Sequence, residues 1–289
     1  MTTLSRKFVV VAALDKEVNK ANNGRMLQLL RGVSPLNPSA DLVLGCTKDV
    51  ATRIRQDNQW RGSIALQDFA KNLQDKTAVS EMRCLGEWVV LDGLDNKLSS
   101  RVLEHEVAVA LQSGFKVIIR LAARLNRNKD DSKSGVLHNI QLIKEHFKTF
   151  PHRMAIAFEV SCSSSPEKKN NFLKETRETL AEIRLWLSQN TDKKTSEQIP
   201  LLFSIPEHFE NLGDIAQVPD LDGIFAARIS SSFEVIRLIK ASKNSTKMLW
   251  KRYQSVKVST ALIKSIRQQY FQSKFLTECR CPKRYISMV

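Results

Sequence analysis

The fold is decided by a seven-residue stretch, Arg153-Met154-Ala155-Ile156-Ala157-Phe158-Glu159. An apolar run of strand length ends there in one carboxylate, and a short loop of mostly small residues follows at once. A barrel strand that delivers a Glu to its C-terminal mouth is a common way to mount a general base. A Glu at an arbitrary strand end is more often simply solvated. The prediction of a base therefore depends on the pattern of the whole chain.

Short β-rich runs alternate with longer amphipathic segments along the chain. Most of these runs are continuously apolar, as expected for strands that are buried on both faces of a parallel sheet. The predicted strands are residues 8–13, 41–46, 63–66, 88–91, 115–121, 154–159, 200–204 and 221–227. Helical patterns between them include residues 98–111, 136–147 and 171–187. This alternation predicts an α/β fold, a single (β/α)8 TIM barrel in residues 1–242.

The competing fold is a doubly wound parallel sheet. Such a sheet usually carries a glycine-rich phosphate loop directly after its first strand. The chain reads Ala12-Ala13-Leu14-Asp15 at that point and has no glycine there. The sequence therefore favours the barrel.

The positive charge is concentrated in a C-terminal extension, residues 243–289. The chain has a net charge of +15, and this extension holds eleven Lys or Arg and one Glu, so it carries +10 of that total. Its apolar residues recur at helical spacing, which predicts a basic amphipathic helix able to bind an acidic partner or an anionic membrane surface. Packing against the barrel or a weakly constrained extension remain alternatives. Because the excess charge belongs to a tail, we expect no specific nucleic-acid recognition.

Composition indicates a cytoplasmic protein. The five cysteines are odd in number and form no CxxC pair, which favours reduced thiols and no zinc site. No apolar run approaches the roughly 20 residues needed to span a bilayer. The start of the chain shows no signal-peptide pattern. We expect neither a metal nor an organic cofactor.

Several segments together resemble the triosephosphate isomerase family. They are Trp88-Val89-Val90-Leu91, Phe115-Lys116-Val117-Ile118 with the helix before it, Ala157-Phe158-Glu159, residues 174–190, and Leu221-Asp222-Gly223-Ile224-Phe225. The resemblance covers about residues 6–242 in the same order and spacing. It implies interconversion of dihydroxyacetone phosphate and glyceraldehyde 3-phosphate, with a Glu base, a neutral His and a closing loop.

The resemblance assigns the base to Glu159 and the closing lid to the loop after it. The family's lid has a proline-rich hinge and a Gly-Thr-Gly tip, and this chain has neither. The loop residues are Val160, Ser161, Cys162, Ser163, Ser164 and Ser165. Closure of the lid is therefore not assured.

Two further catalytic positions of the family are replaced. The Gly-His-Ser motif reads Asp92-Gly93-Leu94, so Gly93 stands in place of the electrophilic His and offers no side-chain donor. Asp15 stands in place of the substrate-binding Lys and would repel a phosphorylated substrate. Lys16 is a possible substitute, although successive side chains of an extended segment point in opposite directions.

Both phosphate-binding segments are also altered. The family's glycine pairs, whose backbone N–H groups cradle the phosphate, read here as Ser204-Ile205-Pro206 and Ala227-Arg228. Pro206 has no N–H group to donate, and Ile205 disfavours a positive φ. Arg228 offers a new cation, which would serve a different anion or simply be solvated.

These replacements lead to three hypotheses. The first is a triosephosphate isomerase homologue that has lost most or all activity, and the second is a working isomerase with a rebuilt site that binds triose phosphate. The third is a non-catalytic scaffold or binding protein that uses its basic tail. The family homodimer would be weakened, because the third loop, within residues 67–88, is shorter than the one that enters the partner subunit.

Overall fold

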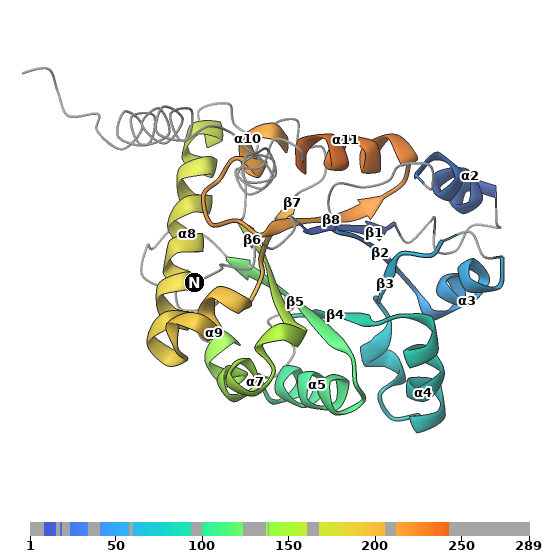
Figure 1. The fold of residues 1–289 in the computed structure, drawn as a ribbon, viewed down its shortest axis with the longest axis horizontal. Helices are drawn as coiled ribbons and strands as arrows, with labels where there is room; N and C mark the ends of the chain where they lie inside the picture. The colour runs from blue at the N-terminus through green and yellow to red at the C-terminus, as the bar shows by residue number, and fades with distance from the viewer. Residues whose placement is uncertain are drawn as a thin grey trace, which may run out of the picture. The chain divides into compact units, whose positions relative to one another are not determined.

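The structure is a computed structural model that describes residues 9–15, 18, 24–33, 41–57, 60–93, 100–123, 137, 139–160, 168–205 and 212–242. Within this part, eight parallel strands close into a barrel in sequence order, from β1 beside β2 round to β8 beside β1 (Figure 1). The strands are β1 (Val9–Leu14), β2 (Asp41–Cys46), β3 (Ser63–Leu66), β4 (Trp88–Asp92), β5 (Lys116–Ala123), β6 (Met154–Val160), β7 (Leu201–Ile205) and β8 (Gly223–Ile229). The predicted (β/α)8 barrel is confirmed. The predicted tail, residues 243–289, lies outside the described residues.

Helices lie between successive strands and surround the barrel (Figure 1). The described helices are α2 (Gly24–Val33), α3 (Lys48–Gln56), η1 (Phe69–Asn72), α4 (Lys76–Leu85), α5 (Ser100–Gln112), α7 (Lys144–Thr149), η2 (Pro151–Arg153), α8 (Lys168–Asn190), α9 (Lys193–Gln198), α10 (Leu212–Ala216) and α11 (Ser232–Ser242). The helical pattern over residues 136–147 corresponds to helical residues on both sides of one break. A turn at Ile143 interrupts it, and α7 begins only at Lys144.

Aspartate side chains accept hydrogen bonds from backbone N–H groups at the start of α4 and of α3. The Asp75 carboxylate accepts hydrogen bonds from Thr77 N at 2.9 Å and Ala78 N at 3.1 Å, which satisfies two free N–H groups at the start of α4. Asp68, in the loop after β3, accepts from Lys48 N at 3.0 Å and so ties the start of α3 to the neighbouring βα loop. One helix start is thus stabilised by a residue next to it in sequence, and the other by a residue from the neighbouring βα loop.

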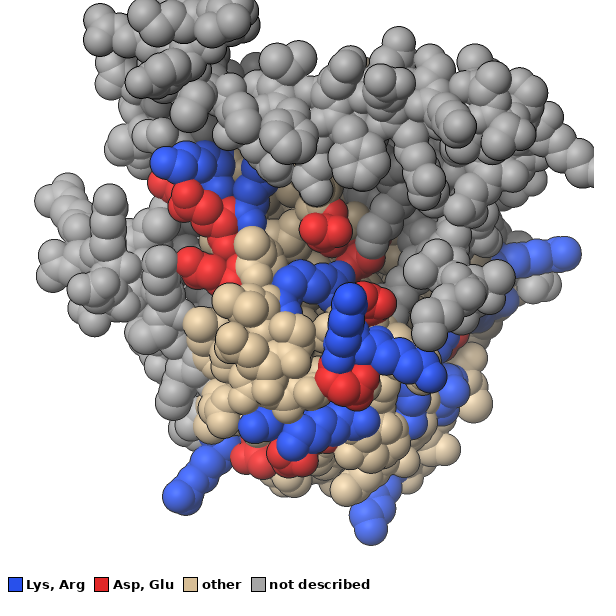
Figure 2. Space-filling model, turned by 60° about the vertical axis from the view of Figure 1, so that its left-hand side comes forward, with Lys and Arg blue, Asp and Glu red and all other residues tan. Residues whose placement is uncertain are grey.

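The outer surface of the barrel helices carries charges of both signs. Figure 2 shows Lys and Arg side chains interspersed with Asp and Glu on the described face, with tan patches between them. Elsewhere on the described surface, exposed charges pair, for example Lys48 with Glu81 and Lys148 with Glu145. Exposed pairs of this kind contribute little to stability. The described part of the face seen there is a mixed surface rather than a basic patch.

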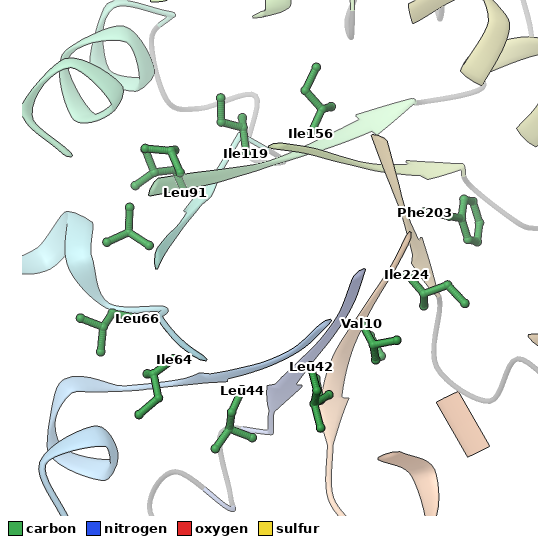
Figure 3. Packing of buried hydrophobic residues seen from close by; sticks show 14 of the residues in the cluster. Val10, Leu42, Leu44, Ile64, Leu66, Leu91, Ile119, Ile156, Phe203 and Ile224 are labelled. Atoms are coloured by element: carbon green, nitrogen blue, oxygen red, sulfur yellow. The ribbon is translucent and has the colours of Figure 1, made fainter. Parts of the chain in front are cut away.

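The main core lies between the barrel and its helices. Side chains such as Val10, Leu44, Ile119 and Ile224 point away from the barrel axis toward this layer (Figure 3). Alternate residues point inward and fill the barrel with mostly small side chains. They are Val11, Ala13, Val43, Ala65, Val90, Ile118, Ala155, Ala157, Leu202 and Phe225. The interior is therefore packed, and space for chemistry exists only at its ends.

One buried ion pair joins α8 to the strands it covers. The Asp222 carboxylate, 2% exposed, accepts a hydrogen bond from Leu201 N at 2.9 Å and pairs with the Arg184 guanidinium. Arg184 Nη1 also donates to Ile199 O at 2.8 Å. These bonds hold the segments that lead into β7 and β8, at the barrel end opposite the strands' carboxyl ends. The arrangement is structural and lies away from the predicted site.

Candidate functional site

Glu159 lies at the carboxyl end of β6, where the sequence places the base. It is the residue before the last in the strand and is paired in register with Ala122 of β5. It shares its face of the strand with Ala155 and Ala157, which line the barrel interior. Its side chain is 34% exposed. Glu159 is thus positioned at the mouth of the barrel.

Arg120, in the middle of β5, fills the space beside this carboxylate. Its Nη1 donates a hydrogen bond to Asp92 Oδ2 at 3.1 Å, and its Nη2 lies 3.7 Å from Glu159 Oε2. Its Cζ lies 5.1 Å from the ring centroid of Phe225, within the range of a cation–π contact. The Arg120 side chain is only 17% exposed. The Arg120 guanidinium therefore lies between two carboxylates and next to the Phe225 ring.

Ser204 completes what we call the mouth cluster: Asp92, Arg120, Glu159, Ser204 and Phe225. Ser204 is 1% exposed, shares its strand face with the interior residue Leu202, and is paired in register with Phe225. Its hydroxyl forms no hydrogen bond with any described residue, and the same is true of the buried Nε of Arg120. Two polar atoms of the mouth cluster therefore retain unused hydrogen-bonding capacity.

The sequence reasoning missed Arg120 and Asp92 as site residues. The signal was present, because one Arg interrupts the otherwise apolar run of residues 117–121 at an inward-facing position. A charge inside a strand that is buried on both faces needs a partner. The predicted fourth strand stopped at Leu91, whereas β4 continues to Asp92 and presents its carboxylate at the mouth.

Gly93, at the position where the resemblance predicts an electrophilic His, has no side chain to direct into the mouth. Its N–H donates to Arg120 O at 2.9 Å. A Cβ at this position would lie 2.9 Å from Leu121 Cδ2, 3.0 Å from Arg120 O and 3.3 Å from Leu103 Cδ2. Leu103 and Leu121 belong to the core outside the barrel. A larger residue at position 93 would therefore push into that core.

Asp15 adds a third carboxylate at the same end of the barrel. It directly follows β1, is half-buried, and its N–H donates to Ile229 O at 3.0 Å. By alternation it lies on the face of Val11 and Ala13, the interior face. Lys16, the possible substitute cation, lies outside the described residues.

The two segments that the resemblance assigns to phosphate binding have different backbones. Ser204 and Ile205 end β7, both buried, and Pro206 lies beyond the described residues. In β8 the pairing with β1 shifts between Ala226 and Ile229, where one extra residue forms a bulge. Arg228 lies in that bulge with a φ of 59° and is exposed. An arginine thus adopts the left-handed conformation that suits glycine.

Of the predicted lid residues, the structure describes only Val160. Val160 is the last residue of β6, and Ser161, Cys162, Ser163, Ser164 and Ser165 lie outside the described residues.

In the ranges that the structure covers, no group of three or more His, Cys, Asp or Glu residues could hold a metal ion. No helix in those ranges is both long and apolar enough to cross a membrane. No protein-family model matches the chain.

Proposed function

We propose that this chain is a triosephosphate-isomerase-like barrel in which isomerase catalysis has been lost. The observation that carries the proposal is the position of Arg120, whose Nη2 lies 3.7 Å from the Glu159 carboxylate. A general base must come within hydrogen-bonding distance of the proton that it removes. The carboxylate at the base position instead faces a cation fixed by its own barrel.

The second requirement of the reaction is a group that polarises the substrate carbonyl and passes protons between its oxygens. Gly93 has no side chain for this purpose, and a larger residue there would meet Leu103 and Leu121. Arg120 is a hydrogen-bond donor, but both of its Nη atoms already face carboxylates. A guanidinium also does not release a proton near neutral pH. Loss of one preorganised donor typically lowers kcat by about 10²–10³.

The third requirement is attraction of a phosphate dianion. The described mouth presents the carboxylates of Asp15, Asp92 and Glu159, and its half-buried cation Arg120 lies between two of them. Arg228 is the other described cation in the altered segments, and it is exposed. Like charges a few ångströms apart repel by about 1 kcal/mol or more even in water. The mouth is therefore a poor receptor for a triose phosphate.

A turnover assay with both triose phosphates tests the proposal. We expect kcat/KM to lie at least about 10⁴-fold below that of a typical isomerase, because the lost donor and the reversed charge act together. The matched control is Glu159→Gln, which keeps the shape of the side chain and removes the base. We expect it to equal the unmodified protein. Turnover within tenfold of the family that disappears in Glu159→Gln would establish the rebuilt isomerase instead.

A further inference from the structure

A second candidate site lies outside the barrel, between η1 and α5. The structure has a pocket of about 530 Å3 there. One wall comes from η1 and the turn after it, and the other comes from successive turns of α5. The lining residues that matter are Leu73, Gln74, Arg101, Val102, His105 and Glu106. None of them belongs to the mouth cluster.

Glu106 is the unusual member of this lining. It is 6% exposed, yet its carboxylate forms no hydrogen bond or ion pair with any residue in the described ranges. Burial raises the pKa of Glu106, and the nearby His105 lowers it by a smaller amount. Its oxygens keep contact with solvent at the pocket, and partial desolvation of a carboxylate costs folding free energy that an apolar residue would not cost. Glu106 thus presents unused acceptor capacity to an open pocket.

The remaining lining defines what could occupy the pocket. Val102 is 38% exposed although it is a large hydrophobic residue, and Leu73 packs partly buried against the core. They give the pocket an apolar part beside the Glu106 carboxylate. Arg101 and His105 are exposed lining residues and would repel additional positive charge on a ligand.

We propose that this pocket binds a small primary amine with a single cationic group and a hydrocarbon body. The ammonium donates to the Glu106 carboxylate, because an ionised carboxylate accepts hydrogen bonds and a charged donor makes the strongest ones. The hydrocarbon body covers Leu73 and Val102 and removes their apolar surface from water. The lining cation Arg101 disfavours polyamines. The site is independent of the proposed loss of isomerase activity.

Calorimetric titration of the full chain at about pH 8, where an ordinary His is neutral, tests the proposal. The probe is 3-methylbutylamine, and 3-methylbutanol is the matched neutral probe. We expect the alcohol to bind at least about tenfold more weakly, since a hydrogen bond to a charged group is worth more than tenfold in affinity. Glu106→Gln should weaken amine binding by a similar factor. The control Glu104→Gln, on an exposed position of α5, should leave it unchanged.

A second variant keeps the test decisive if Glu106→Gln folds poorly. Val102→Ser retains the carboxylate, removes exposed apolar surface, and should weaken amine binding several-fold without affecting the fold. On titration with the amine, the backbone amide NMR signals of the pocket residues Gln74 and Val102 should shift. The proposal is overturned if amine and alcohol bind equally, if Glu106→Gln binds the amine as tightly as the unmodified protein, or if no binding is detected.

Discussion

Arg120 on β5 and Glu159 on β6 face each other across neighbouring strands, with Nη2 of the first 3.7 Å from Oε2 of the second. Their strands are adjacent and both side chains emerge on the interior face, Arg120 from the middle of β5 and Glu159 near the carboxyl end of β6. The carboxylate that the sequence predicts as a base is therefore part of an ion-pair cluster that also includes Asp92. The proposed loss of isomerase catalysis depends on this relationship.

The mouth cluster and the buried pair Arg184–Asp222 should differ in their contribution to stability. Arg120→Met should change the free energy of unfolding by about 1 kcal/mol or less, because its partners Asp92 and Glu159 are 55% and 34% exposed. Asp222→Asn should cost about 3 kcal/mol, because it leaves Arg184 without its buried partner. Urea unfolding measures both. If Arg120→Met is as destabilising as Asp222→Asn, the mouth cluster is a structural element.

The left-handed backbone at Arg228 predicts that glycine is more stable than alanine at this position, the reverse of the usual order within a strand. Arg228→Gly should be more stable than Arg228→Ala by about 0.5–1 kcal/mol, since glycine adopts a φ near 59° without steric cost. The neighbouring residue Ala227 is the control, because its φ is not positive. There Ala227→Gly should lower the stability. Thermal unfolding of the three variants checks this, and equal stability of Arg228→Gly and Arg228→Ala would contradict the bulge conformation.

Glu106 predicts a specific pH dependence of stability. Burial raises its pKa in the folded chain above the unfolded value, so the folded state binds the proton more tightly. Stability from this group is then greatest at low pH and is lost as the pH rises through the folded pKa. Glu106→Gln should therefore be more stable than the unmodified protein at about pH 8, and this advantage should shrink toward about pH 4, near the ordinary Glu pKa.

His105 lies beside Glu106 and its charge lowers the pKa of that carboxyl, and Arg101 also lines the pocket. Urea unfolding should therefore compare Glu106 and Glu106→Gln proteins that both carry His105→Gln. Glu104→Gln in the same background controls for a general effect of removing one acid from α5. An advantage of Glu106→Gln that is equal at both pH values would show that the carboxylate is not desolvated in the folded chain.

The barrel could be predicted from the sequence because continuous apolar runs report burial on both faces, whatever the loops do. β2 and β3 end at the predicted residues for this reason. The turn at Ile143 was missed because the helical spacing of apolar residues continues through it. Such spacing records which face is buried and does not record a local break in hydrogen bonding.

The site was predicted only in part, because its geometry depends on contacts between strands that are distant in sequence. Glu159 could be placed from its strand alone. The pairing of Arg120 with Asp92, 28 residues away, requires the register between β4 and β5. The burial of Glu106 was also hidden, since a Glu among the polar positions of a helix is normally solvated. Packing of η1 beside α5 decides its environment.

The most direct test of the central claim is exchange of the carbon-bound protons of dihydroxyacetone phosphate in deuterated water. Proton abstraction by Glu159 would introduce deuterium even if later steps were slow, and NMR detects it at the substrate. We predict that the protein gives the same slow exchange as Glu159→Gln, because the carboxylate faces Arg120 and no donor polarises the carbonyl. Deuterium incorporation that is faster with the unmodified protein and abolished in Glu159→Gln would contradict the account.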